Sequence, residues 1–504
     1  MYIAIATVVL LLGLLLWRRA QTNLPYPPGP PPKPLIGNLP DIPREREALA
    51  YSAMADTYGD ILRLGVLGKN IIVVSSFEAL TELFHKRSVN YSDRPHSTMM
   101  NKLMDLEWIF AFRSYGNEWR DHRKLFHSQF QEFVVPEFRQ TQARAAHKLA
   151  HEVIQSPEKL FHHLHMHVGG VLMDITYAMG MNPRTEKLIN MADDVIMAWS
   201  KVATPGAYLV DVIPIMRYIP EWLVPGRGGF QREARVCKES AVEARNRPFN
   251  EVVSEMKHGT AKPSFVSKLL SQAGPNPDLE MMRATAGTVY FGRTEAVSIC
   301  LRTFILAMVT YPDVQAKAKR ELDSVVGRDR LPGFEDMDAL PYINAIVKEV
   351  MRWNPPAPMA IPHVTVKDDE FRGYHIPGGS VVIGNLWKIL HNPEVYPDPM
   401  RFTPERFTTG VKGGDLATAE EHLEAVYGLG RRICPGRFAA VSQLFITIAT
   451  LLSVFDILPG ADENGNKVTV EPDFTFSYAS HPAPFKHSMV PRGEYVKSLL
   501  ELAD

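Results

Sequence analysis

The sequence predicts a mainly α-helical protein with small β-sheets, built as one large domain behind an N-terminal membrane anchor. Three observations predict this class. Long segments with helical apolar periodicity fill most of the chain, strand-like segments are short and few, and a single proline-rich linker lies near the N-terminus. A length of 504 residues alone would favour about three domains, but no second linker, repeat or low-complexity segment divides the sequence.

The composition is that of a folded globular protein. Hydrophobic residues make up 45% of the chain and charged residues 22%. The formal net charge is −1 and no long basic run occurs, which argues against a nucleic-acid partner. Three cysteines at unrelated spacings argue against a disulfide scaffold or a zinc module.

The chain begins with an apolar segment. Residues 2–17 carry no charge, and Arg18 and Arg19 follow directly. A membrane-spanning helix needs about 20 apolar residues, with a lower limit near 17. A cleaved signal peptide is the alternative, but its positive charge normally precedes the apolar run. We therefore predict a transmembrane anchor over residues 1–19, with the following chain on the cytoplasmic side because of the two arginines.

A proline-rich linker follows the anchor over residues 20–38. The stretch "LPYPPGPPPKPLIGN" is dense enough in proline to favour an extended, stiff backbone. It is either a plain spacer or a rigid arm that fixes the orientation of the main domain on the membrane. Both interpretations place the main domain at residues 39–504.

The main domain opens with a strand pair and continues with helices. Apolar runs on either side of Gly68, Lys69 and Asn70 predict a β-hairpin over residues 60–76. The clearest predicted helices cover residues 117–130, 281–311 and 340–355, and short strand-like segments return near 361–366, 380–384 and 474–479. The 281–311 helix is nearly uncharged, so we expect it to be buried.

A histidine-rich stretch raises the question of a metal site. In "FHHLHMH", His163 and His167 lie four residues apart, a spacing that can place both on one helical face. No Asp, Glu or Cys stands beside them at ligand spacing, so we favour a structural role over metal binding.

Cys434, in "YGLGRRICPG", has three candidate roles. Gly428 and Gly430 fit the start of a phosphate-binding G-x-G-x-x-G loop, but position 433 is isoleucine. A nucleophilic cysteine needs a histidine and an orienting group, and no local residue supplies them, although a distant histidine stays open. The third candidate role is that of a heme ligand, because the small Gly430 and Gly436 would let the macrocycle lie close to the backbone.

The segment resembles the cysteine loop of the cytochrome P450 family, F-x-x-G-x-R-x-C-x-G. Four positions match and tyrosine replaces the phenylalanine: Gly430, Arg432, Cys434 and Gly436, with Tyr427 in the aromatic position. The resemblance implies that Cys434 is the axial ligand of heme iron and that Arg432 contacts a heme propionate.

Further motifs appear in the family's order. Glu349 and Arg352 match its E-x-x-R pair and share a helical face. Arg406, in "PERF", completes the group that braces the heme-binding core in the family. The resemblance also assigns propionate contacts to a W-x-x-x-R helix and to a later histidine, here Trp119, Arg123 and His363. Alone, each residue would have an ordinary structural explanation; the ordered set favours the family.

The resemblance covers essentially the whole chain and most closely suits membrane-bound fungal members of natural-product pathways. It implies the cytochrome P450 fold, heme b as cofactor, and electrons from NADPH through a separate reductase, with cytochrome b5 as a second candidate donor. It also implies hydroxylation or other oxidation of a lipophilic terpenoid, polyketide or similar metabolite. The implied location is the endoplasmic reticulum membrane, with a single span and a cytoplasmic catalytic domain.

The sequence departs from the family over the iron. The family pattern A/G-G-x-D/E-T falls on residues 292–296, where the acid is Glu295 but the threonine is Ala296. In the family that hydroxyl assists proton delivery during oxygen activation. A substrate hydroxyl and an ordered water could replace it. Alternatively, the enzyme desaturates, couples, rearranges or dehydrates without inserting oxygen, or the protein is an inactive heme-binding membrane protein.

Two neighbours of Glu295 enter the same hypothesis. Thr294 carries a hydroxyl but lies on a different helical face from Ala296. Arg293 shares a face with Ala296, so it either stands in the substrate cavity and meets Glu295, another acid or an acidic substrate, or turns away to the cavity edge. We hypothesise an oxygenated or acidic substrate.

The family's substrate-contact segments are aromatic in this chain. They contain Trp108, Phe110, Phe112, Met359 and Tyr478, which predicts an apolar cavity. The apolar segment 207–226 is expected to face the membrane. Two cations on the Trp119 helix mark either a reductase-docking face or a solvated face, namely Arg120 and Lys124.

Overall fold

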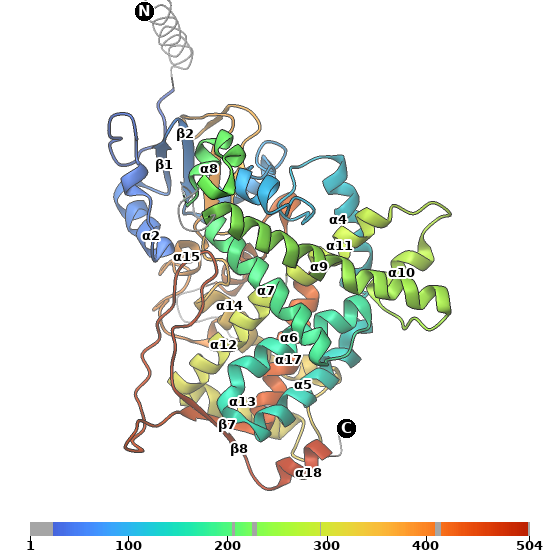
Figure 1. The fold of residues 1–504 in the computed structure, drawn as a ribbon. Coiled ribbons are helices and arrows are strands. Elements are labelled where there is room, and N and C mark those ends of the chain that lie inside the picture. Colours follow the sequence, from blue (N-terminus) through green and yellow to red (C-terminus); the bar gives the residue numbers. More distant parts are fainter. Residues whose placement is uncertain (1–23, 204–206, 224–228, 293, 409–414, 502–504) are drawn as a thin grey trace, which may run out of the picture.

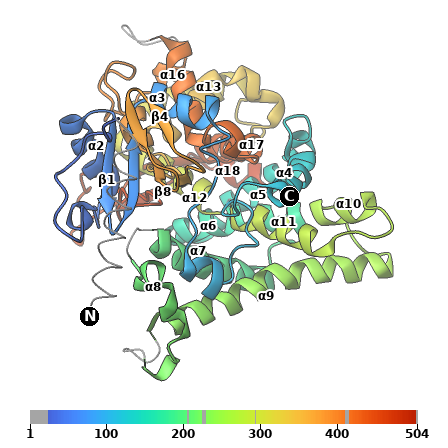
Figure 2. The same ribbon diagram turned by 90° about the horizontal axis from the view of Figure 1, so that it is seen from above.

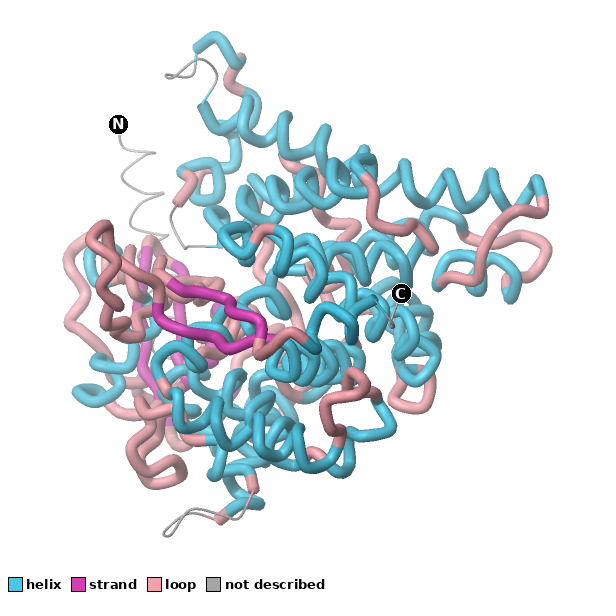
Figure 3. Tube along the Cα trace, turned by 90° about the horizontal axis from the view of Figure 1, so that it is seen from below, coloured by secondary structure: helices cyan, strands magenta, loops and turns pink. Residues whose placement is uncertain are grey.

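The computed structural model describes residues 24–203, 207–223, 229–292, 294–408 and 415–501. The predicted anchor, residues 1–19, lies outside the described residues, as does the start of the predicted linker. Helices fill most of one large body, and most of the strands gather on one side of it (Figures 1 and 3). The predicted fold class, mainly α-helical with small sheets, is confirmed.

The predicted hairpin is present but turns more tightly than expected. β1 (Ile61–Val66) and β2 (Lys69–Val74) pair in antiparallel register. Only Leu67 and Gly68 form the loop, with φ of 48° and 82°. Two successive positive φ angles give the turn whose twist suits a two-residue hairpin, so Lys69 and Asn70 belong to the second strand.

The hairpin extends into a four-stranded sheet. β6 (Val381–Gly384) runs parallel to β2, and β3 (His363–Val364) pairs antiparallel with β6. The strands predicted near 361–366 and 380–384 are therefore confirmed. Two small antiparallel pairs complete the β-structure: β4 (Asp369–Phe371) with β5 (Tyr374–Ile376), and β7 (Phe455–Pro459) with β8 (His487–Pro491).

The strand predicted near 474–479 is wrong. The segment is irregular and holds a single bridge, from Phe474 to Pro482. Phe474 and Phe476 are both buried, and each packs near the Trp387 ring, at centroid distances of 6.4 and 4.8 Å. Alternating burial here comes from packing of two rings. Phe476 has φ of 54°, which extended strands do not adopt.

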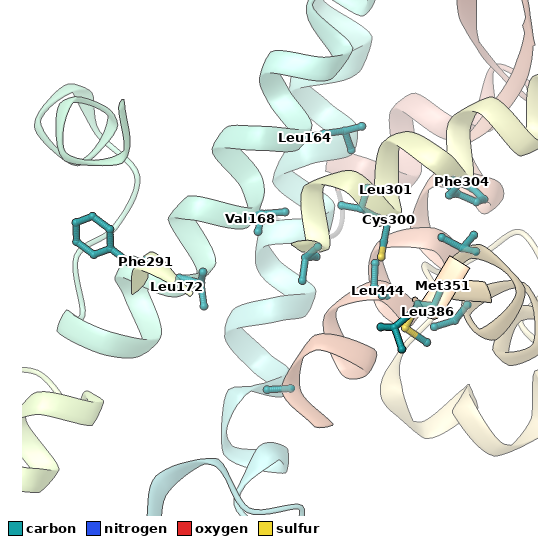
Figure 4. Close-up of a cluster of buried hydrophobic side chains, with 14 of the residues drawn as sticks. Leu164, Val168, Leu172, Phe291, Cys300, Leu301, Phe304, Met351, Leu386 and Leu444 are labelled. Carbon is teal, nitrogen blue, oxygen red and sulfur yellow. The ribbon is translucent and has the colours of Figure 1, made fainter. Parts of the chain in front are cut away.

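The helices surround a core built around α6, α12 and α17. Figure 4 shows Leu164 and Val168 of α6 beside Leu301 of α12, with Cys300 of α12 pointing toward Leu444 of α17. The α-helices of the described chain are α2 (Glu47–Tyr58), α3 (Phe77–Thr81), α4 (Asn117–Phe130), α5 (Arg139–Gln155), α6 (Leu160–Tyr177), α7 (Pro183–Ala203), α8 (Leu209–Val212), α9 (Gly229–His258), α10 (Phe265–Gln272), α11 (Leu279–Phe291), α12 (Thr294–Thr310), α13 (Pro312–Val325), α14 (Pro341–Trp353), α15 (Leu386–Leu390), α16 (Leu416–Glu424), α17 (Arg437–Val454) and α18 (Tyr495–Glu501).

Helix α17 is long and apolar enough to cross a membrane, with a mean hydropathy of 1.6. However, 78% of it is buried inside the protein. The helical run Leu279–Thr310 passes the same test only together with α13, to which it is bent by 106°. Because they are buried inside the protein, we interpret these segments of the described chain as core helices and not as membrane spans.

Two of the predicted helices have the expected extent, and the third is described in two parts. Helix α4 covers residues 117–130, and α14 ends at Trp353 because Asn354 precedes a proline, which disfavours helical backbone. Within the helix predicted over 281–311, α11 ends at Phe291 and α12 begins at Thr294, and the residue at 293 lies outside the described residues. Both are largely buried, as expected from their composition.

The histidines of α6 have separate structural partners. His163 bonds to the Ser156 hydroxyl, whereas His167 bonds to Thr447 at 2.9 Å and to the Ala145 carbonyl at 3.2 Å. Across the described residues, no group of three His, Cys, Asp or Glu side chains is arranged to hold a metal ion. These hydrogen bonds support a structural role for His163 and His167.

Candidate active site

A cavity of about 350 Å³ lies between α12 and the segment that carries Cys434. Its walls also come from α4, α7, α11 and the segment 356–363. The lining is mostly apolar, and the charged groups among the described lining residues are one carboxylate and four guanidinium groups: Glu295, Arg94, Arg123, Arg432 and Arg437.

The Cys434 segment is a closed loop held by its own backbone. The Cys434 N–H donates to the carbonyl of Tyr427 at 2.7 Å. Gly430 has φ of 60°, and a Cβ there would lie 2.0 Å from the carbonyl oxygen of Phe84. Only glycine satisfies both the left-handed backbone and this close approach. The loop therefore packs directly on η2 (Glu82–Lys86), and the cysteine is fixed at the cavity wall.

Two further residues of this loop, Gly436 and Tyr427, also line the cavity. Gly436 is the residue before α17, and Tyr427 points its hydroxyl toward the Met351 sulfur at 3.2 Å. Burial raises the pKa of Tyr427, so the phenol stays neutral. The tyrosine thus fills the aromatic position without bringing a charge beside Cys434.

Three arginines converge at the cavity, one of them buried and two partly buried. Arg432 donates to the carbonyls of Ser92 and Arg113 at 2.8 and 2.7 Å, and Arg123 donates to the Ile433 carbonyl at 2.6 Å. The third, Arg94, was missed by sequence reasoning. It donates to the carbonyls of Ala111, Ile361 and Pro362.

The electrostatics of these arginines call for an anion. None of the three forms an ion pair with a carboxylate of the described chain. Burial, with the neighbouring charge of Arg94, lowers the pKa of Arg432 to about 8, and burial lowers the pKa of Arg94 and Arg123 to about 10. Concentrated buried positive charge requires a compensating partner.

Trp119 and His363 flank the arginines. The Arg432 guanidinium lies 4.6 Å from the centroid of the Trp119 ring. His363 stacks on Phe84 at 4.0 Å, and its Nδ1 bonds to the Tyr91 carbonyl. Burial, with the charge of Arg94, holds the pKa of His363 well below its usual range. A neutral ring that donates from Nδ1 presents only an acceptor at Nε2, so Arg94 is the better propionate partner in this corner.

The donor set fits a heme. A dianionic macrocycle needs cations for its two carboxylates, an apolar slot for its plane and one soft ligand for its iron. The cavity offers the buried arginines, apolar walls and the Cys434 side chain in one place. Arg432, Arg94 and Arg123 would hold the propionates, and Cys434 would hold the iron.

Behind the cavity lies a buried charge cluster. Arg352 donates from Nε and one terminal nitrogen to the two oxygens of Glu349, both at 2.7 Å. Arg406 approaches the same carboxylate at 3.4 Å, and the backbone N–H of Thr403 donates to it at 2.8 Å. The side chains of Glu349 and Arg352 are 0% exposed. The predicted trio is thus assembled, and it joins α14 to the 397–406 segment.

The start of α12 is the other wall of the cavity. Glu295 and Ala296 line it, as predicted. Glu295 Oε1 lies 3.0 Å from Nε2 of His481, a contact that sequence reasoning did not foresee. Thr294 is the first residue of α12, but its side chain lies outside the described residues, as does the whole of Arg293. The hypothesis about Arg293 therefore stays a prediction.

The substrate side of the cavity is aromatic, as expected, but not through every predicted residue. Phe110, Phe112 and Tyr478 line it. Trp108 and Met359 do not: both are buried, and Trp108 packs beside the Arg245 guanidinium at 5.1 Å and against Phe291. The sequence pattern did not predict that Trp199 on α7 belongs to this site. Its ring stacks on Phe112 at a centroid distance of 4.5 Å and meets Tyr478 edge-on at 4.2 Å.

Comparison with known proteins agrees with this geometry. A family profile described as "Cytochrome P450" matches residues 27–489. The chain is 38% identical to a cytochrome P450 monooxygenase of Armillaria gallica, with 99% of this chain and 98% of the relative covered. It is also 38% identical to the tryptamine 4-monooxygenase of Psilocybe cyanescens, with 93% and 94% covered, and to a cytochrome P450 monooxygenase of Postia placenta, with 96% and 94% covered.

Proposed function

The chain belongs to the cytochrome P450 family, whose members are heme-dependent monooxygenases, and we propose that it oxidises a lipophilic secondary metabolite of the terpenoid or polyketide kind. The single observation that carries this proposal is the cavity itself. The Cys434 thiol, a group of arginines and a largely apolar, aromatic lining meet in this one cavity.

The proposed division of labour follows from the charges. When bound, heme supplies the redox centre at which dioxygen is reduced with electrons that originate from NADPH. Cys434 holds the iron, Arg432 and its neighbours neutralise the propionates, and the Gly430 turn keeps the thiol at the wall. Phe112, Trp199 and Tyr478 pack together at the cavity wall, where they orient the substrate and exclude water.

Membrane association is part of the proposal. Beside the predicted anchor at 1–19, the segment 209–223 exposes a run of large apolar side chains: Leu209, Val212, Ile213, Ile215, Tyr218, Trp222 and Leu223. This segment, which includes α8, lies at the same end of the molecule as the β1–β2 hairpin (Figures 1 and 2). Many exposed apolar side chains in one short segment are typical of a membrane or partner contact, and a lipophilic substrate would enter there. The proposed location is the endoplasmic reticulum membrane.

Electrons would arrive at the exposed face of α4. Arg120 and Lys124 are exposed on this helix, whose inner side carries Trp119 and Arg123. These two cations, next to the arginines proposed to bind the propionates, suit an acidic partner. We propose an NADPH-dependent reductase as that partner, with cytochrome b5 as a second electron donor.

Ala296 supports a second candidate function, a reaction that does not insert oxygen. It lines the cavity and has no hydroxyl, so the same heme could desaturate, couple, rearrange or dehydrate its substrate without inserting oxygen. Coexpression with a reductase under oxygen-18 gas, in a host that makes candidate substrates, separates the two. Label in the new metabolite supports monooxygenation, and an unlabelled new product supports the alternative.

The controls address the third possibility, an inactive heme protein. Cys434→Ser should abolish product, whereas Cys237→Ser, at a buried cysteine away from the cavity lining, should retain it. No NADPH consumption with any reductase and substrate tested, in a chain that binds heme, would contradict the proposed enzyme.

A further inference from the structure

We propose that His481 and Glu295 form a proton relay from solvent into the cavity, which supplies protons that the missing hydroxyl at position 296 cannot deliver. This inference rests on the proposed function, because it concerns proton supply to that same site. It adds a residue, His481, from a loop 186 positions away from Glu295 in the chain.

The position of Glu295 is the first step. It is the one carboxylate among the described residues that line the cavity, and it lies in the first turn of α12 beside Ala296. Its side chain is 31% exposed, whereas its partner His481 is not among the described lining residues. Glu295 is therefore the acidic side chain of the described wall through which a proton can reach the cavity.

His481 is the second step. Its Nε2 lies 3.0 Å from Oε1 of Glu295, and its side chain is 33% exposed to solvent. Imidazole is the side chain that gains and loses protons most readily near neutral pH. The pair therefore joins water outside to a carboxyl group at the cavity.

The backbone around His481 holds the ring in place. The His481 N–H donates to the Thr475 hydroxyl at 3.0 Å, and the Thr475 N–H donates back to the His481 carbonyl at 2.9 Å. The N–H of Ser480 donates to the Pro356 carbonyl at 3.0 Å, which ties the turn to a cavity-lining segment. These hydrogen bonds fix the backbone of the turn that carries His481 next to the cavity.

The transfer balances in protons and charge. The imidazolium gives its Nε2 proton to Oε1 of Glu295. The neutral carboxyl group then rotates toward the cavity and gives this proton to a water molecule or substrate oxygen there, which restores the carboxylate. With the carboxyl group turned away, Nε2 of the neutral ring takes a new proton from H3O+ on the solvent side. The Arg302 guanidinium attracts the carboxylate of Glu295, and the nearby Tyr478 phenol stays neutral.

The decisive experiment compares His481→Gln with His481→Ala in the full chain with its reductase. Glutamine keeps a hydrogen-bond donor toward Glu295 but cannot carry a proton. For both variants we expect product formed per NADPH to fall by about tenfold or more, with a larger solvent deuterium isotope effect and unchanged substrate affinity. His258→Gln, at an exposed histidine in the last turn of α9, should behave like the unaltered enzyme.

Two further readouts separate a relay from a structural role. Turnover driven by hydrogen peroxide should survive in both His481 variants, because peroxide brings its own protons. The contact itself is tested without turnover: in Tm measurements, His481→Ala and Glu295→Gln should lower Tm by less in combination than the sum of the single effects.

Each outcome has a clear meaning. Normal product yield per NADPH in His481→Gln would overturn the relay, and so would additive Tm losses or equal loss of peroxide-driven turnover. If the unaltered enzyme forms no product and consumes no NADPH, the proposed function fails instead, and the two failures are distinguishable.

Discussion

Neutralising Glu349 should destabilise the domain more than any other single charge change. The carboxylate is fully buried and accepts three hydrogen bonds within 2.8 Å, two from Arg352 and one from the backbone of Thr403. Glu349→Gln keeps the shape and one acceptor oxygen, but it leaves two buried guanidinium groups without a counterion, those of Arg352 and Arg406. Removing one partner of a buried pair costs about 3–5 kcal/mol, a large part of the about 5–15 kcal/mol that stabilises a domain.

The assay is denaturant and thermal unfolding of the purified protein, with heme absorbance per chain as a second readout. Glu280→Gln is a matched control, because Glu280 and Arg283 form a pair with the same three-residue spacing at 2.6 Å. The Glu280 side chain is 59% exposed, so its loss should cost about 1 kcal/mol or less. The expected result is a loss at least three times larger for Glu349→Gln than for the control.

A double variant checks the cause. If the cost comes from the uncompensated charge of Arg352, then Glu349→Gln combined with Arg352→Met should recover part of the stability lost by Glu349→Gln alone. Equal stabilities for the buried and exposed variants would refute the reasoning. A double variant that is weaker than the sum of both single changes would also refute it.

Three further predictions concern the heme loop, the membrane surface and acid stability. Gly430→Ala should strongly lower heme content, because its Cβ would lie 2.0 Å from the Phe84 carbonyl, whereas Gly465→Ala, with φ of 82° but open space, should keep its heme. Trp222, 81% exposed, should be quenched by brominated lipids in the full chain, so that Trp222→Tyr reduces the quenching of tryptophan fluorescence without lowering Tm; unchanged quenching would contradict the membrane contact. Burial lowers the pKa of His167 to about 4. The unfolded chain therefore takes up a proton first as pH falls below about 6.5, and roughly 3 kcal/mol is lost by about pH 4; His167→Asn should flatten this loss in unfolding measurements, and an equally steep loss would contradict it.

Local spacing explains why so much of the site could be predicted from sequence. Glu349 and Arg352 lie three residues apart, so a helix alone places them on one face. Trp119 and Arg123 are four residues apart on α4 and line the same cavity. The Cys434 loop closes on itself through a bond from Cys434 to Tyr427. Each motif is set by backbone geometry over a few residues.

The missed residues depend on contacts between distant segments. Arg94 is held by carbonyls of residues 111, 361 and 362, and no spacing within one segment indicates that convergence. Trp199 and His481 likewise act on partners from other elements. The error at Trp108 has the same origin, because only tertiary packing decides which aromatic side chain of a segment faces a cavity and which fills the core.

Two wrong predictions of secondary structure have a different origin, in the pattern of apolar residues. The alternation at 474–479 came from two phenylalanines that pack near Trp387, not from a strand. The apolar run at 281–311 gave no indication that α11 ends at Phe291. Hydrophobic periodicity reports which side chains are buried, but it does not report whether the backbone between them stays regular.

The departure that bears on oxygen chemistry lies at the start of α12. The Cys434 loop keeps its cysteine, arginine and two glycines and departs only at Tyr427, and the Glu349 cluster keeps all three family residues. Ala296 lies at the start of α12, beside Glu295 of the Glu295–His481 pair. Heme binding and stability should therefore depend on the first group of residues, whereas proton supply and product type should depend on the second. It follows that heme content cannot report a defect at Ala296 or His481, and that the ratio of product to consumed NADPH is the quantity to measure.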